Sequence, residues 1–382
     1  MGNFVGRIGG MSSKRFLSPW KNSSEKPVIY HCVSRVVDRR FVLKEEEREK
    51  FRMFMRMVEN FSGCRVLSYC LMSNHFHILL EVPPAPAEGI SDGEILRRLG
   101  AIYSEAAVAA IAREMEEARA EGAEALLGEI RLRHTRRMHD LSEFMKALLI
   151  RFTRWFNRTH QRTGTLWEDR FKSVIVESGL AARTMAAYID LNPVRAGMVE
   201  DPAEYRWSSY GEAVGGGKKG NGKKAREGLV RANRCDKGVG FDATQWLEVA
   251  KSYRILLGMA VARKRGKAKL EEVMGKGKAP GKAPGKAAEM RNMNMEEIIE
   301  HLEKTGQTIG LPDLTAAKIL RMRVRYFTDG AVIGSKAFVN EAFAGARERF
   351  SERRKDGARR MRGSGAAAKG VLWSMRDLRV GV

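Results

Sequence analysis

Residues 65–82 read RVLSYCLMSNHFHILLEV, and this stretch decides the fold. Two apolar runs of strand length, at 65–72 and 75–82, flank the short polar pair Ser73-Asn74. Such a pair between two apolar runs is typical of a β-hairpin. The stretch therefore predicts two neighbouring antiparallel strands in a sheet.

The hairpin is flanked by segments with either strand or helix spacing of their apolar residues. Runs rich in β-branched and aromatic residues favour strands, whereas apolar residues that recur every three or four positions favour amphipathic helices. In chain order, the predicted elements are a strand at 27–35, a helix at 45–61, the two hairpin strands, a helix that begins near 140, a strand at 171–177 and a helix at 181–192.

The first six elements follow the order strand, helix, strand, strand, helix, strand. This is the split βαβ arrangement of ferredoxin-like and RRM-like folds. We therefore expect an α+β protein with an antiparallel sheet and packed helices. Residues 83–140, which are rich in Ala, Glu and Arg, interrupt this order and predict a helical insertion.

The composition changes after residue 210. Residues 211–290 contain GGGKKGNGKKAREG and a KAPG repeat, which predict a basic linker with one short helix. Residues 291–382 predict a small helical C-terminal unit with a basic tail. Two predicted helices in it, near 314–325 and 335–350, could form a helix-turn-helix. The predicted domains are therefore 23–210, 211–290 and 291–382.

The charge balance of the chain points to a polyanionic partner. Its 382 residues include 69 Lys and Arg against 46 Asp and Glu, which gives a formal net charge of +23. A hydrophobic fraction of 43% excludes a wholly disordered protein. An excess of positive charge this large favours nucleic acid or an acidic membrane surface. Four cysteines without a CxxC pair indicate a reducing compartment, and no apolar run is long enough for a membrane span. We expect a cytoplasmic protein with no membrane partner.

The tripeptide His75-Phe76-His77 opens the second hairpin strand. Side chains alternate along a strand, so both imidazoles lie on one face and Phe76 on the other. Two imidazoles in this arrangement can bind one metal ion together. Two histidines with only structural contacts are the alternative interpretation.

Tyr188 and Asn192 are four residues apart in the last predicted helix and share one face. A tyrosine is a weak nucleophile at neutral pH because its reference pKa is about 10. Beside a metal-bound phosphate it can attack and form a covalent phosphotyrosine. The alternatives are a packed tyrosine and an asparagine that ends the helix before Pro193.

Five segments occur along the chain in the order YHCVSR, MSNHFHILLEV, TGTLWEDRFKS, YIDLNPVRAGMV and YRWSSY. Together they resemble the REP-associated tyrosine transposases, which belong to the HUH superfamily of single-strand DNA nucleases. The resemblance runs from about residue 28 to 210 and leaves out the insertion. It is more specific than either motif alone because all five segments keep the family's order.

The resemblance implies a role for each matching residue. His75 and His77 match the family's metal ligands. Tyr188 matches its catalytic tyrosine, and Asn192 stands where a third ligand is expected. The implied cofactor is Mg²⁺ or Mn²⁺. The implied activity is cleavage and rejoining of single-stranded, hairpin-forming DNA through a 5′-phosphotyrosine, by a catalytic domain at 23–210 of a nucleoid-associated protein.

Basic and aromatic residues near these motifs predict a DNA-binding surface. Trp167, Arg170 and Lys172 lie together in WEDRFKS, where an aromatic ring could stack on a base and cations could contact phosphates. Arg195 follows the tyrosine motif, and Arg35 follows the first strand. For Trp167, a place in the core is the alternative interpretation.

Three other functions stay open at this point. The first is a non-catalytic RRM-like nucleic-acid binder, and the second is a relaxase or replication-type nuclease with the same chemistry. The third is a regulator that acts through the C-terminal helices. The intact set of His75, His77 and Tyr188 disfavours a pure binder. The sequence also leaves open a homodimer.

Overall fold

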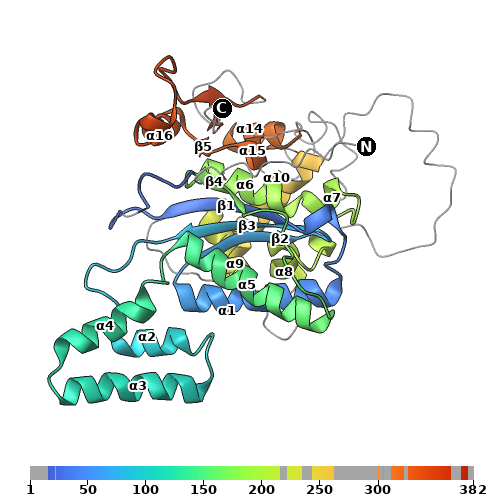
Figure 1. Ribbon diagram of the computed structural model, residues 1–382. Coiled ribbons are helices and arrows are strands. Elements are labelled where there is room, and N and C mark those ends of the chain that lie inside the picture. Colours follow the sequence, from blue (N-terminus) through green and yellow to red (C-terminus); the bar gives the residue numbers. More distant parts are fainter. Residues whose placement is uncertain are drawn as a thin grey trace, which may run out of the picture.

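The structure is a computed structural model that describes residues 16–21, 23–215, 222–234, 243–261, 300, 304, 311–321, 326–362 and 371–376. A sheet lies at its centre, helices cover both faces of the sheet, and a helical arm extends from one end (Figure 1). Within the described ranges, no helix is both long and apolar enough to cross a membrane.

The central sheet has the strand order β2-β3-β1-β4-β5-β7-β6. Its strands are β1 (Val28–Arg35), β2 (Arg65–Leu71), β3 (His75–Val82), β4 (Lys172–Val176), β5 (Val332–Gly334), β6 (Arg359–Arg360) and β7 (Trp373–Met375). β1 pairs antiparallel with both β3 and β4, and β2 and β3 form the predicted hairpin. The predicted α+β class is therefore confirmed.

One face of the sheet is covered by α1 (Glu45–Ser62) and α5 (Leu141–Thr159). The ring of Phe51 in α1 lies 4.9 Å from that of Phe76 in β3 and 5.0 Å from that of Phe152 in α5. Burial of each such side chain stabilises the folded state by about 1.5–3 kcal/mol. This packing fixes the position of β3, and with it the position of the side chains on the opposite face of the strand.

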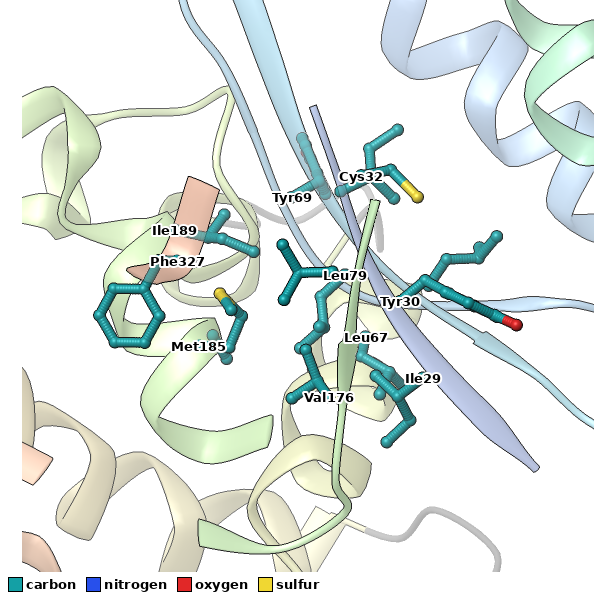
Figure 2. Close-up of a cluster of buried hydrophobic side chains, with 14 of the residues drawn as sticks. Ile29, Tyr30, Cys32, Leu67, Tyr69, Leu79, Val176, Met185, Ile189 and Phe327 are labelled. Carbon is teal, nitrogen blue, oxygen red and sulfur yellow. The ribbon is translucent and has the colours of Figure 1, made fainter. Parts of the chain in front are cut away.

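The opposite face of the sheet is covered by α6 (Leu180–Asp190). Met185 and Ile189 of α6 belong to a buried cluster that includes Leu79 of β3 (Figure 2). The helix predicted at 181–192 is in fact two helices, because α7 (Asn192–Arg195) follows α6 with Pro193 in its first turn. Proline fits there because the N–H groups of a first turn have no helical partner.

The insertion forms three helices, α2 (Asp92–Leu99), α3 (Glu105–Ala120) and α4 (Glu124–Thr135). They enclose a small hydrophobic core of their own, to which Phe61 of α1 contributes. Ser91 and Ser104 begin α2 and α3 by accepting a backbone N–H with their hydroxyls, as N-cap residues do. The predicted helical insertion is thus the arm in Figure 1.

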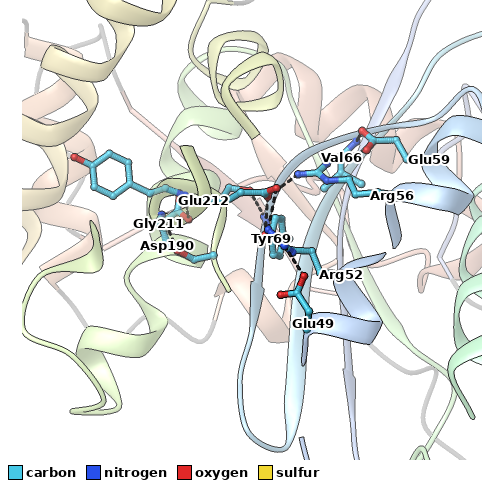
Figure 3. A network of polar contacts seen from close by, with 12 residues as sticks. Glu49, Arg52, Arg56, Glu59, Val66, Tyr69, Asp190, Gly211 and Glu212 are labelled. Carbon is cyan, nitrogen blue, oxygen red and sulfur yellow. Dashed lines mark hydrogen bonds and ion pairs between the residues drawn. The ribbon is translucent and has the colours of Figure 1, made fainter. Parts of the chain in front are cut away.

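The segment predicted as a linker contains the packed helices α8 (Ser209–Gly215), α9 (Lys223–Asn233) and α10 (Ala243–Val261). The buried Glu212 accepts a hydrogen bond of 2.7 Å from the Tyr69 hydroxyl and pairs with Arg52 and Arg56 at 3.3 and 3.0 Å (Figure 3). These contacts correct the expectation of a linker that begins at 211. The high Gly and Lys content is typical of a linker, so the packing of these helices was not predicted. The KAPG repeat lies outside the described residues.

The C-terminal part is not the separate helical unit that we predicted. It contains α14 (Leu311–Arg321), α15 (Tyr326–Asp329) and α16 (Lys336–Ala344), but β5 pairs parallel with β4 and extends the sheet. β5 also separates α14 from α16, so they form no helix-turn-helix. A strand of three residues is too short to give a period-two pattern. Apart from the start of the linker and the separate C-terminal unit, the predicted domain boundaries stay predictions.

Candidate active site

His75 and His77 lie at the start of β3 on the face covered by α6. Their ring centroids are 5.1 Å apart, and the His77 ring lies 5.9 Å from the ring of Tyr188 in α6. His77 is buried, with 3% of its surface exposed, whereas His75 is half-buried. The structure therefore brings the predicted imidazoles and tyrosine to one place.

His31 of β1 belongs to the same cluster and was missed in the sequence. Its Nε2 lies 3.0 Å from Nδ1 of His77, and its Nδ1 lies 2.8 Å from the carbonyl oxygen of Phe327 in α15. The signal was available within the YHCVSR segment. An antiparallel neighbour of β3 presents alternate residues to the same face, but the register that brings His31 beside His77 is not written in the sequence.

The three histidines are uncharged at neutral pH. Burial lowers the pKa of His31 to about 4. Burial, with the nearby Arg35 cation, lowers the pKa of His75 to about 4. The pKa of His77 is lowered well below its usual value, chiefly by burial and then by its neighbouring histidines. A neutral imidazole keeps the lone pair that a metal ion requires.

Tyr188 is held between an aromatic ring and a cation. The Phe327 ring lies 4.6 Å from its ring, and the Arg195 guanidinium lies 5.0 Å from its ring centroid. Burial raises the pKa of Tyr188, and the positive charge of Arg195 opposes that shift. The phenol is therefore protonated at rest, next to a cation that favours its ionised form.

Arg195, which we predicted to contact DNA, bonds to two backbone carbonyls. Its Nη1 donates to the carbonyl of Tyr188 at 3.2 Å and its Nη2 to that of Leu320 at 2.9 Å. These bonds join α14 to the end of α6. Two of its five donors are thus used to hold the tyrosine helix.

Asn192 is the first residue of α7 and lies one turn after Tyr188. Its Nδ2 donates to the carbonyls of Tyr188 and Ile189 at 3.1 and 3.2 Å, which leaves Oδ1 as the atom able to bind a metal. Among the described residues, no group of three or more His, Cys, Asp or Glu could hold a metal ion. Two neutral imidazoles with an amide oxygen nevertheless fit a divalent cation, since imidazole suits transition metals and amide oxygen suits Mg²⁺ or Mn²⁺.

The other predicted DNA-binding residues divide into two groups. Arg35 pairs with His75 across the β1–β3 ladder, and Lys172 pairs with Val33 across the β1–β4 ladder. Paired residues point to the same face, so both cations flank the histidines. Arg170 is exposed just before β4.

Trp167 is a core residue, and its predicted role in DNA binding is wrong. It is 8% exposed, and its ring lies 5.3 Å from that of Phe76 and 6.2 Å from that of Phe51, on the sheet face opposite His77. Its indole nitrogen donates to the Thr153 hydroxyl at 3.1 Å. A ring enclosed in this way cannot stack on a base.

A group of cations lies away from this site, in a groove of about 960 Å³ between α1, α5 and the end of α4. The cationic residues that line the groove are Lys50, Arg136, Arg137, Lys146, Arg151, Arg154 and Arg158. Glu143 is the one carboxylate among its lining residues, and it pairs with Lys146 at 3.4 Å. This basic groove is therefore strongly positive.

Comparison with known proteins agrees with the geometry. Residues 3–91 match the family model of IS200-like transposases. The resemblance to a transposase is thereby confirmed. The match covers β1, β2 and β3 with all three histidines of the site, and it ends before α6 and Tyr188.

Two further comparisons are with curated protein sequences and with solved structures. No curated protein sequence matches this transposase-like chain. A solved structure of a REP-associated tyrosine transposase bound to a REP hairpin matches with a TM-score of 0.34 and 12% identity. That match covers 62% of this chain and 96% of the other.

Proposed function

We propose that this protein is a metal-dependent tyrosine transposase that cleaves and rejoins single-stranded, hairpin-forming DNA. The observation that carries the proposal is the Tyr188 ring 5.9 Å from the buried His77, with His75 beside it. A structural tyrosine has no need of two neutral imidazoles, one buried and one half-buried, at the start of one strand. The transposase match over residues 3–91 supports the same class of activity.

His75, His77 and Asn192 would hold Mg²⁺ or Mn²⁺ against the scissile phosphate. When bound, the cation polarises a phosphoryl oxygen and offsets the charge that develops on it. Arg35 and Lys172 carry positive charge on the same sheet face, where they attract the neighbouring phosphates. Positively charged groups on either side of the histidines thus orient the DNA strand.

The Tyr188 hydroxyl oxygen attacks the phosphorus, and its proton leaves to solvent. A bond forms between this oxygen and phosphorus while the bond to the 3′ oxygen breaks. The 3′ oxygen takes a proton from solvent, which leaves a 5′-phosphotyrosine and a free 3′-OH. The Arg195 cation over the ring stabilises the phenolate as the proton departs. Attack by a 3′-OH on the phosphotyrosine then rejoins DNA and restores the phenol without an external energy source.

The test is a covalent protein–DNA band on a denaturing gel, after incubation with a labelled single-stranded hairpin and Mn²⁺. Wild type should form the band, and Tyr188→Phe should not. Tyr103→Phe is the matched control, because Tyr103 is 38% exposed in the insertion, away from the histidines. A band of equal strength from Tyr188→Phe would overturn the mechanism and leave a non-catalytic binder or another nuclease type as the better account.

A further inference from the structure

A chain of hydrogen bonds leads from the backbone of α15 to the candidate metal ligand His77. The carbonyl oxygen of Phe327 bonds with Nδ1 of His31 at 2.8 Å, and Nε2 of His31 bonds with Nδ1 of His77 at 3.0 Å. Both imidazoles are buried, with 0% and 3% of their surfaces exposed. Water therefore does not compete for these bonds.

The chain of bonds determines where each proton lies. A carbonyl oxygen only accepts, so Nδ1 of His31 carries a proton. A neutral imidazole has one N–H, so Nε2 of His31 accepts, and Nδ1 of His77 must donate to it. Nε2 of His77 is then left with its lone pair. The Phe327 carbonyl thus determines the tautomer of His31 and, through His31, the tautomer of His77.

We propose that His31 is a positioning residue of the metal site, which holds His77 in the tautomer that presents Nε2 to the divalent cation. This inference rests on the proposed function, because it concerns the same site. An outer hydrogen bond of this kind orients a ligating histidine and raises its basicity. His75 has a local counterpart, since its Nδ1 lies 2.7 Å from the side-chain oxygen of Asn74.

The acceptor at the end of this chain comes from a distant part of the sequence. Phe327 lies 296 positions after His31 and reaches it because β5 pairs with β4 next to β1. The Phe327 ring also packs on Tyr188 at 4.6 Å. The C-terminal segment therefore contributes to both halves of the site, the metal ligands and the nucleophile.

The test uses the full chain without DNA. His31→Leu fills the space but removes both hydrogen bonds, whereas His31→Gln keeps a donor and an acceptor on one planar amide. Affinity for Mn²⁺, measured from the electron paramagnetic resonance of the free ion, should fall about 10–100-fold in His31→Leu. His31→Gln should retain most of the affinity. Cys32→Ala is the control for disturbance of β1, because Cys32 is fully buried on the opposite face.

The tautomer itself is read from ¹⁵N chemical shifts of the imidazole of His77 in metal-free protein. Wild type should show a protonated Nδ1 and a bare Nε2, and this measurement stands even if His31→Leu does not fold. A protonated Nε2 in wild type, or wild-type Mn²⁺ affinity in a folded His31→Leu protein, would overturn the inference. If wild type binds no Mn²⁺ at all, the proposed function fails, and the ¹⁵N shifts alone decide whether His31 orients His77.

Discussion

The buried site beneath α6 and the basic groove on the other side of the sheet carry different kinds of polar group. Beneath α6, the buried imidazoles of His31 and His77 are neutral and hydrogen-bonded to each other. Over the other face, the basic groove carries cations such as Arg154 and Arg158, both exposed. A charge is costly to bury, so these groove cations lie at the surface, whereas the buried imidazoles beneath α6 are groups that can lose their charge.

This difference separates attraction of DNA from chemistry on it. Surface cations act over about 8–10 Å at moderate salt, whatever the DNA sequence. The lone pairs of neutral histidines act only on an atom in direct contact. The net charge of +23 therefore favours a polyanionic partner, but it carries no information about the reaction.

The largest expected effect is on the α6 face. We expect His77→Ala to lower the yield of the covalent DNA adduct by at least about 100-fold, because it removes a ligand from a site with few others. The gel assay with Mn²⁺ measures this. His134→Ala, in the arm, should behave as wild type, and an adduct yield that His77→Ala leaves unchanged would remove the histidines from the mechanism.

Active-site sharing between two copies provides a second test of the same face. Tyr188 lies beside His77 of its own chain, with the rings 5.9 Å apart. A mixture of Tyr188→Phe and His77→Ala proteins should therefore form no adduct, because each site lacks one essential group. Adduct formation by the mixture, when each variant alone is inactive, would show that the tyrosine acts on a partner's histidines in a dimer.

Stability depends more on buried than on exposed ion pairs. Glu212→Ala leaves Arg52, Arg56 and the Tyr69 hydroxyl without their shared partner. We expect the free energy of unfolding in urea to fall by about 3 kcal/mol, the low end for a buried pair, because each arginine keeps another carboxylate. In comparison, Glu143→Ala at the groove should cost less than about 1 kcal/mol. Equal losses would contradict this ranking.

The smallest effect is expected at the basic groove. No carboxylate among the described residues lies within 4.0 Å of Arg154 or Arg158. If each contacts one phosphate, the double change to Gln should reduce the slope of log affinity against log salt by about 2 in hairpin-DNA binding. The adduct yield at saturating DNA should stay at the wild-type level. Arg113→Gln with Lys251→Gln removes equal charge elsewhere, and an equal loss of slope there would show that the groove has no special part.

Local patterns predicted the elements of the first 210 residues well. The hairpin, α1 and α6 each bury a regular apolar face, and this regularity can be seen in the sequence. The short strand β5 could not be found because three residues give no period, although its pairing with β4 adds the C-terminal segment to the sheet. The buried Glu212 was hidden in the same way, because its partners lie in α1 and β2.

The candidate site was predictable where one element carries two of its groups. The spacing of His75 and His77, and of Tyr188 and Asn192, follows from strand and helix periods. His31 depends instead on strand register and on the carbonyl of Phe327, neither of which leaves a local pattern. Trp167 was misjudged because an aromatic residue among cations has the same composition in a core as at a DNA surface.

The central claim is that Tyr188 becomes covalently bonded to DNA. Mass spectrometry of the trypsin- and nuclease-digested adduct tests this most directly. The account predicts a nucleotide linked through phosphate to the Tyr188 side chain, in a peptide that also contains Asn192. Attachment to any other residue, or a Tyr188 peptide without added mass while the gel shows an adduct, would contradict it.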